Sequence, residues 1–432
     1  MSVLSDRLNG VLAEEAPVLA ASLSPLGRQA AFPPDIPFQA AEARDKELNA
    51  TIGQVTDGRG SVLAPEGIVD QLGGWESSDR NRGLLYSPLE GFPELRRAWR
   101  SWQRRFVSPD TESSLPLVTV GLTHGLSLVA DLFGGANRTV AVATPFWGNY
   151  RQAFELRTGA RIVGEPAYQE NRFDPEALAR VAEAAPDGEP VVAILNFPSN
   201  PGGYSPSDVE RAEIVGSLCS AADHRPIVAL CDDAYAGLVH DPEISAASLF
   251  WDLSGAHPNL SPIKVDGGTK EFSLFGGRVG FLTFGLHPES EAAAAMESKV
   301  KCLLRATVGS PVATTQLVLL NALQTNGVEA QMEVIRGRLS RRCQTLAAAL
   351  DASDSDLFRA LPFNSGCFAL LELSSRLGMP ANDVRKHMLS AQDTGLISIE
   401  PRYLRIAFCS VENGKLEELV RRIERGVEEL AT

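Results

Sequence analysis

The sequence predicts an α/β fold in which a largely parallel β-sheet is covered by helices on both sides. Between about residues 115 and 285, short β-branched apolar runs alternate with longer amphipathic segments. Apolar runs of this length, bounded by Gly, Pro or Asp, are typical of strands that are buried on both faces. The runs are LVTV (117–120), VAVAT (140–144), VVAILNF (191–197), PIVALCD (226–232) and VGFLTFG (279–285).

Two segments between these runs have the pattern of amphipathic helices. PEALARVAEAA covers residues 175–185, and SPSDVERAEIVGSLCSAA covers residues 205–222 and begins with Ser205, a plausible N-cap. Strands and helices that alternate along the chain indicate parallel strands joined by helical crossovers.

The flanking regions predict a second, smaller α+β domain. A helical region over 312–350 is interrupted at Asn326 and Gly327, and a final helix is predicted over 415–430. Between them lie the apolar runs CFALLEL (367–373) and YLRIAFCSV (403–411). The first 70 residues are rich in Pro and Gly, and we expect them to pack on this C-terminal unit. Because a chain of 432 residues normally forms more than one core, we predict a large domain over 75–315 and a small discontinuous domain made of 1–74 and 316–432.

Composition limits the classes of partner. With 40 basic and 54 acidic residues the net charge is −14, which makes nucleic acids and anionic membranes poor partners and favours a small molecule. No apolar window is long enough for a membrane helix, and the N-terminus does not resemble a secretory signal. The six cysteines have neither CxxC nor metal-ligand spacing, so we expect reduced thiols, a cytoplasmic location and no metal site.

Polar residues follow the apolar runs at the points where strands end. In open α/β sheets, ligands bind at the carboxyl ends of the strands, so we expect these segments to converge on one crevice. Four segments follow a run: GLTHG (121–125), TPFW (144–147), NFPSNPGG (196–203) and CDDAY (231–235). A fifth, GGTKEFSLFGGRVGF (267–281), leads into the last run and holds a Lys and an Arg eight residues apart.

Each segment also has a simpler structural interpretation. Thr123 could cap a helix, Trp147 could belong to the core, residues 200–203 could be only a turn, and Lys270 could lie on the surface. The combination is harder to explain in this way. An amine, a carboxylate, an aromatic ring and an anion cradle in one crevice are the groups that pyridoxal phosphate requires.

The same segments resemble the motifs of the class I/II aminotransferase family of fold-type-I pyridoxal-phosphate enzymes. NFPSNPGG resembles the NPxNPxG element, DDAY (232–235) the DxAY element, and Thr269 to Arg278 the [ST]K element with its downstream arginine. YSPLEGFPELRRAW (86–99) resembles a further family segment, and YLRIAF places Arg405 at the position of a carboxylate-binding arginine. The resemblance implies a mostly parallel seven-stranded sheet flanked by helices in the large domain.

The resemblance also implies the catalytic residues. Lys270 is expected to form the Schiff base with the cofactor and then to act as the base at the substrate Cα. Asp232 is expected to keep the pyridine nitrogen protonated. Its neighbour Asp233 points to the other face of the strand, and the choice of Asp232 places Tyr235 at the family's spacing. Tyr235 and Asn200 are expected to hydrogen-bond the phenolic oxygen of the cofactor.

The remaining roles concern the cofactor phosphate, the ring and the substrate. Trp147 is expected to stack on the ring, and Arg405 is expected to bind the substrate α-carboxylate as a bidentate fork. The phosphate is expected to contact Thr123, Thr269, Arg278 and the N–H groups of Leu122 and Thr123. Gly53, Asn200 and Trp147 are expected to complete the substrate site. In the family Tyr86 reaches the phosphate of the neighbouring subunit, which implies a homodimer with shared active sites.

We therefore predict a ping-pong aminotransferase that moves the amino group of an L-amino acid to a 2-oxo acid. A lyase, decarboxylase or oxidase on the same scaffold is an alternative, and a non-catalytic pyridoxal-phosphate sensor is a third. The sequence departs from the family at Gly267, where a second phosphate-binding hydroxyl is common. Aspartate or glutamate, aromatic and small neutral amino acids all remain open as substrates.

Overall fold

The computed structural model describes residues 3–15, 20, 23, 28–29, 36–58, 61–73, 75–107, 111–169, 171–399 and 401–431. Its main element is a seven-stranded sheet with the order β2-β10-β9-β8-β7-β3-β4. Within this sheet only β10 runs antiparallel to its neighbours. The strands are β2 (Leu117–Thr119), β3 (Thr139–Thr144), β4 (Arg161–Pro166), β7 (Val191–Leu195), β8 (Ile227–Asp232), β9 (Leu260–Asp266) and β10 (Gly280–Phe284). The predicted α/β fold with a mostly parallel seven-stranded sheet is confirmed.

Helices cover both faces of this sheet, and alternating strand residues show which helix covers which face. Val192 and Ile194 of β7 belong to the same apolar cluster as Leu126 of α8 (Leu122–Phe133). The intervening residue Ala193 belongs to a second cluster, with residues of α9 (Ala177–Ala184) and α10 (Asp208–Ala222). Helix α10 begins with a capping box between Ser207 and Glu210, so its N-cap is Ser207 and not Ser205.

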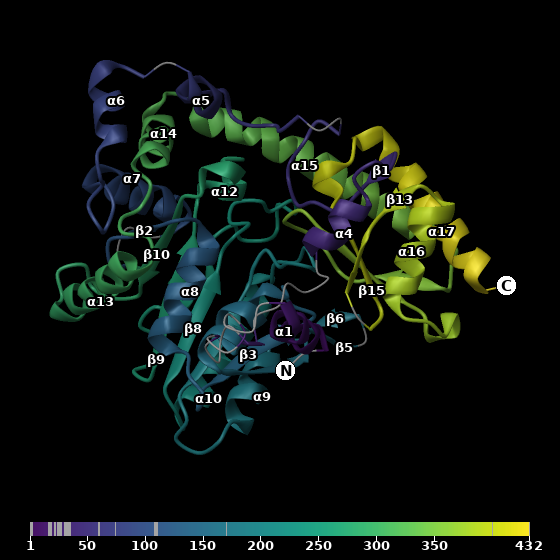
Figure 1. Ribbon diagram of the computed structural model, residues 1–432, viewed down its shortest axis with the longest axis horizontal. Helices are drawn as coiled ribbons and strands as arrows, with labels where there is room; N and C mark the ends of the chain where they lie inside the picture. Colours follow the sequence, from purple (N-terminus) through teal and green to yellow (C-terminus); the bar gives the residue numbers. More distant parts are fainter. Residues whose placement is uncertain are drawn as a thin grey trace.

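A second, antiparallel sheet carries the C-terminal part of the chain. Its order is β11-β12-β15-β14, with bounds Phe358–Ala360, Ala369–Leu373, Tyr403–Ile406 and Ile397–Ile399. Helices α15 (Val328–Asp351), α16 (Ala381–Ala391) and α17 (Leu416–Ala431) pack with it in one core. Gly327, with φ +85°, separates α14 (Ala313–Gln324) from α15 at the predicted interruption. Figure 1 shows this unit in yellow and green beside the large sheet.

The N-terminal segment contacts the C-terminal unit directly. Strand β1 (Leu48–Asn49) pairs in parallel with β13 (Thr394–Gly395), and α4 (Ile36–Glu42) lies against β14. The division into domains 75–315 and 1–74 plus 316–432 stays a prediction, as Leu317 and Met332 pack with Phe281 of the large sheet.

The other elements connect or flank these sheets and helices. They are α1 (Val3–Glu15), α5 (Glu66–Val69), α6 (Ser77–Leu84), α7 (Pro93–Gln103), α11 (Leu249–Leu253), α12 (Gly268–Glu271), α13 (Glu291–Thr307), the β5 (Tyr168–Gln169) and β6 (Arg172–Phe173) hairpin, a π-helical segment Arg151–Leu156 and several 3₁₀ turns. Of the helices described, none is long and apolar enough to cross a membrane.

Candidate active site

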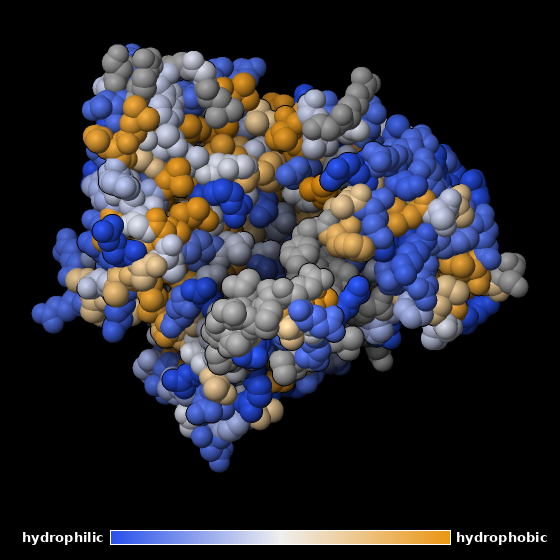
Figure 2. All heavy atoms as spheres, viewed as in Figure 1, coloured by the Kyte–Doolittle hydropathy of each residue, from blue (hydrophilic) through white to orange (hydrophobic). Residues whose placement is uncertain are grey.

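A cavity of about 180 Å³ lies at the carboxyl ends of β3, β7 and β8, next to the start of α8. Figure 2 shows a hollow with a hydrophilic floor in the middle of the face that it presents. Most of the predicted site residues line this cavity: Gly53, Leu122, Thr123, Trp147, Asn200, Asp232, Tyr235, Lys270, Arg278 and Arg405. Segments from both flanks and from the ends of five strands, β2, β3, β7, β8 and β9, therefore converge, as the sequence predicts.

Asp232 is the last residue of β8 and its side chain is almost fully buried in the cavity wall. Its Oδ2 accepts a 2.6 Å hydrogen bond from the hydroxyl of Tyr150, whereas its buried Oδ1 accepts none from the described residues. Burial raises the pKa of Asp232, and the Tyr150 hydroxyl and the nearby Lys270 lower it in part. A buried carboxylate oxygen with a vacant acceptor site fits a protonated pyridine nitrogen.

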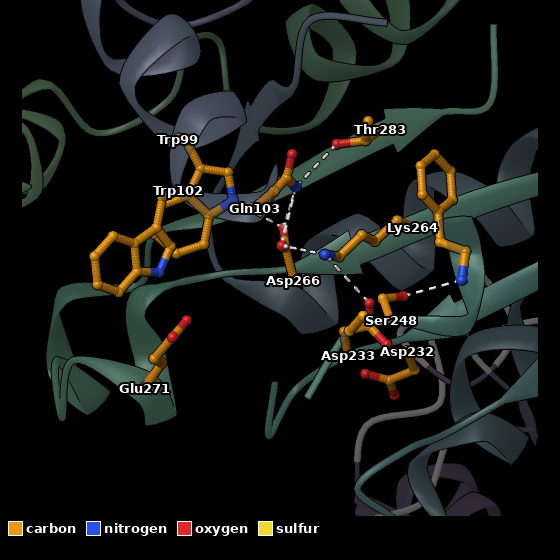
Figure 3. A network of polar contacts seen from close by, with 12 residues as sticks. Trp99, Trp102, Gln103, Asp232, Asp233, Ser248, Lys264, Asp266, Glu271 and Thr283 are labelled. Carbon is orange, nitrogen blue, oxygen red and sulfur yellow. Dashed lines mark hydrogen bonds and ion pairs between the residues drawn. The ribbon is translucent and has the colours of Figure 1, made fainter. Parts of the chain in front are cut away.

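Asp233 has a different environment, which Figure 3 shows. Its Oδ2 lies 3.4 Å from the Nζ of Lys264, away from the cavity. Burial raises the pKa of Asp233 to about 6, although Lys264 lowers it. Of the two neighbouring carboxylates, the geometry therefore favours Asp232 as the one that faces the ring.

Lys264 is part of a buried polar network behind the site (Figure 3). Its Nζ also lies 3.2 Å from Oδ2 of Asp266. The side chains of Lys264, Asp233 and Asp266 are each about 4% exposed. Asp266 accepts hydrogen bonds from Trp99 Nε1 at 3.0 Å and from Gln103 Nε2 at 2.9 Å. Burial lowers the pKa of Lys264, but the two carboxylates raise it by more. The network holds the ends of β8 and β9 together.

Lys270 lies on the short helix α12, directly after β9. Its Nζ is 5.6 Å from the centre of the Tyr235 ring, and burial lowers the pKa of its amine. A lowered pKa increases the fraction of neutral, nucleophilic amine. The preceding residue, Thr269, directs its hydroxyl to the carbonyl of Val279 at 3.5 Å and does not line the cavity.

The start of α8 and Arg278 form the polar end of the cavity. The first N–H groups of an α-helix have no partner inside the helix and attract anions. Gly121 precedes α8 with φ +78°, and a Cβ at this position would lie 2.6 Å from Nη2 of Arg278. Only glycine leaves the backbone and the guanidinium this close together. At Gly267 a Cβ would lie 2.6 Å from the Val279 carbonyl oxygen, so the backbone here has no room for the hydroxyl side chain that is common in the family.

Arg405 lies on β15 of the second sheet and lines the cavity. Its Nη1 donates to Asn200 Oδ1 at 2.9 Å and its Nη2 to the Thr51 carbonyl at 2.8 Å. Its guanidinium lies 4.2 Å from the centre of the Phe368 ring. Gly53 approaches the same ring so closely that a Cβ would lie 2.5 Å from it. The arginine is therefore held in place by polar and aromatic contacts.

Tyr86 does not line the cavity, and with 93% exposure it is the most exposed of the large hydrophobic residues described. Conversely, the sequence interpretation missed Tyr150 and Asn196. The Asn196 side chain donates to the Asp232 carbonyl and accepts from the N–H of Asn200, both at 2.8 Å. The spacing of Trp147 and Tyr150, about one helical turn, is a signal that could have indicated Tyr150. No cluster of three or more possible metal ligands occurs among the described residues.

Comparison with known proteins identifies the family to which this chain is similar. The model of the family "Aminotransferase class I and II" matches residues 46–423. An aspartate aminotransferase of Bacillus subtilis is 24% identical over 320 residues, covering 72% of this chain and 74% of the relative. An aminotransferase structure from Anaerococcus prevotii has a TM-score of 0.82 at 18% identity, covering 94% of this chain and 98% of that one.

A second solved structure is α-aminoadipate aminotransferase LysN from Thermus thermophilus, complexed with N-(5′-phosphopyridoxyl)-L-leucine. Its TM-score is 0.76 at 22% identity, and the match covers 95% of this chain and 98% of that one.

The fold and the site define a fold-type-I transferase. The chain belongs to the class I and II aminotransferase family. It is an aminotransferase whose cofactor is pyridoxal phosphate, which confirms the predicted fold class, enzyme class and cofactor.

Proposed function

We propose that this aminotransferase acts on an L-amino acid and a 2-oxo acid through the ten cavity residues described above. The observation that carries the proposal is the convergence of Lys270, Asp232 and Arg405 on one cavity. When bound, pyridoxal phosphate supplies an electron sink for the charge that is left when the substrate Cα–H bond breaks.

The residues that line the cavity would hold the different parts of the cofactor. The N–H groups of Leu122 and Thr123, together with Arg278, would bind the phosphate. Trp147 packs on the ring. Asp232 keeps a proton on the ring nitrogen.

Two further polar residues that line the cavity, Tyr235 and Asn200, would hold the phenolic oxygen of the cofactor. Burial raises the pKa of Tyr235 far above its usual value, so that its hydroxyl stays protonated and donates a hydrogen bond to the phenolic oxygen. Asn200 contacts the same oxygen.

Arg405 binds the substrate, and Lys270 transfers its proton. Arg405 forms a bidentate pair with the α-carboxylate, near the N–H of Gly53. In one half-reaction Lys270 Nζ would take the proton from the Cα of the amino acid, and in the other it would deliver a proton to the Cα that derives from the 2-oxo acid. Its lowered pKa makes the neutral amine available for this step.

We propose that the protein is a homodimer. Tyr86 and its neighbours Leu84 and Leu85 are between 60% and 93% exposed, a patch that a second copy can cover. Tyr86 then contacts the phosphate in the partner's cavity. The cytoplasmic location also stays a proposal, supported by six cysteines that form no disulfide.

A half-reaction tests the proposed activity. Purified holoenzyme is mixed with single L-amino acids, and the conversion of the cofactor to pyridoxamine phosphate is followed by its absorbance. We expect conversion with at least one amino acid and its reversal by a 2-oxo acid. Release of ammonia, carbon dioxide or peroxide without amine exchange would instead favour a lyase, decarboxylase or oxidase.

A further inference from the structure

A second cavity adjoins the active-site cavity. Its volume is about 580 Å³, and it shares Ile36, Trp147 and Asn200 with the active-site cavity. Because Trp147 and Asn200 belong to the proposed substrate site, a substrate bound there could extend its side chain into this space.

The wall of this second cavity is largely apolar. Its large apolar residues come from α4, from the segment after β3, from the turn after β7 and from β14: Ile36, Phe38, Phe146, Trp147, Pro201 and Ile399. Phe38 is 49% exposed, so its ring is not taken up by the core and is available to a ligand.

Most polar side chains of the same wall are paired with one another. Gln39 exchanges hydrogen bonds with the backbone of Ser398, at 2.7 Å as acceptor and at 3.2 Å as donor. Arg385, only 2% exposed, forms an ion pair with Glu42 at 2.7 Å and donates to Asn382 at 2.9 Å. The buried guanidinium is therefore already neutralised by a carboxylate of the protein.

A dicarboxylate substrate would find a poor partner in this wall. Burying a carboxylate without a matched cation is costly, and Arg385 has only its Nη1 without a hydrogen bond to the described residues. Lys386, the other cation in the described lining, is solvent-exposed, where an ion pair contributes little. An apolar side chain, by contrast, gains from burial against Phe38, Phe146 and Ile399.

We propose that the donor amino acid carries a bulky apolar or aromatic side chain, which occupies this second cavity, and is neither aspartate nor glutamate. The proposal rests on the proposed transamination. In it, Phe38 is a residue that determines specificity, and the pair of Glu42 and Arg385 excludes acidic side chains by removing the free cation that they would need.

The test compares amino acids in the half-reaction of the holoenzyme. We expect kcat/KM for L-phenylalanine, L-leucine or L-methionine to exceed the values for L-aspartate and L-glutamate by at least about tenfold. Phe38→Ala is expected to lower kcat/KM for L-phenylalanine about tenfold, with less effect on L-alanine. Phe38 is an exposed residue, so this variant should fold.

The charge argument has its own variant. Glu42→Gln leaves Arg385 without its counter-charge, and we expect it to raise kcat/KM for L-glutamate relative to L-phenylalanine about tenfold. Glu47→Gln is the matched control, because it removes a carboxylate from another ion pair of the same N-terminal segment, with Arg422. We expect this control to change neither value.

A binding measurement separates recognition from turnover. By calorimetry, 3-phenylpropanoate should bind the holoenzyme more tightly than glutarate. If wild-type enzyme converts aspartate, glutamate or alanine faster than every bulky apolar amino acid, or binds glutarate more tightly, the inference is overturned and transamination stands. If no amino acid converts the cofactor, the proposed function itself fails.

Discussion

The hydroxyl of Tyr150 donates a 2.6 Å hydrogen bond to Oδ2 of Asp232, and both side chains are buried. This contact joins the segment after β3 to the end of β8. Burial and the neighbouring carboxylate raise the pKa of Tyr150 well above its usual value, so the phenol stays a neutral donor. The bond fixes the orientation of Asp232 and stabilises its ionised form.

Replacing Tyr150 by Phe should weaken the hold of Asp232 on the cofactor. Without the donor, the pKa of Asp232 rises further, and the loss of a hydrogen bond to a charged group costs about 1.5–3 kcal/mol. We expect kcat to fall about tenfold or more and the apoenzyme to bind pyridoxal phosphate more weakly. Fluorescence titration of the apoenzyme measures the affinity, and an unchanged affinity and kcat would contradict this role.

Lys264→Met should destabilise the fold more than it changes the chemistry. It leaves Asp233 and Asp266 as neighbouring buried carboxylates, and breaking a buried pair typically costs about 3–5 kcal/mol. Denaturant unfolding measures the difference. The control is Arg376→Ala, since the ion pair of Arg376 with Asp356 is exposed and contributes less than about 1 kcal/mol. Equal losses in the two variants would refute the contrast.

Asp233 should give the stability a specific pH dependence. Its folded pKa of about 6 lies above the ordinary value of 3.8, so between these values the native state binds more protons than the unfolded state. Its contribution is present below pH 3.8 and is lost as the pH rises through 6, by at most about 3 kcal/mol. The free energy of unfolding of the wild type, minus that of Asp233→Asn, should show this fall between pH 4 and pH 7. A difference that rises with pH would contradict the sign.

Arg405→Lys should affect substrates according to their α-carboxylate. A lysine cannot reproduce the fork that donates to Asn200 and Thr51, nor its planar contact with Phe368. We expect kcat/KM for L-amino acids to fall about 100-fold, while the cofactor still binds. Amines that lack a carboxylate should lose little. An equal loss for both kinds of substrate would argue against carboxylate binding by Arg405.

The large sheet shows how far sequence patterns reach. The five apolar runs became β2, β3, β7, β8 and β10, but β9 and β4 have no such pattern. Strand β9 contains Pro262, Lys264 and Asp266, which are unusual in a central strand. The structure shows that Lys264 forms a buried ion pair with Asp266, a contact that the sequence pattern does not reveal. Strand β4 is an edge strand with several exposed residues, so its apolar content is low.

The site was predictable where its residues belong to local motifs. Asp232 ends β8, Lys270 follows β9 and Arg278 precedes β10, each within a recognisable motif. Partners that meet only in three dimensions were not predictable. Examples are Tyr150 against Asp232, and Glu42 against Arg385, whose α4 and α16 lie far apart in the sequence. Their pairing depends on how the two sheets are placed.

The central claim is that Lys270 carries the cofactor. Borohydride reduction of the holoenzyme followed by peptide mass mapping measures this directly. The account predicts a pyridoxyl group on the peptide that contains Lys270, and its absence in Lys270→Ala. A pyridoxyl group on another lysine, such as the buried Lys264, or on none, would contradict it.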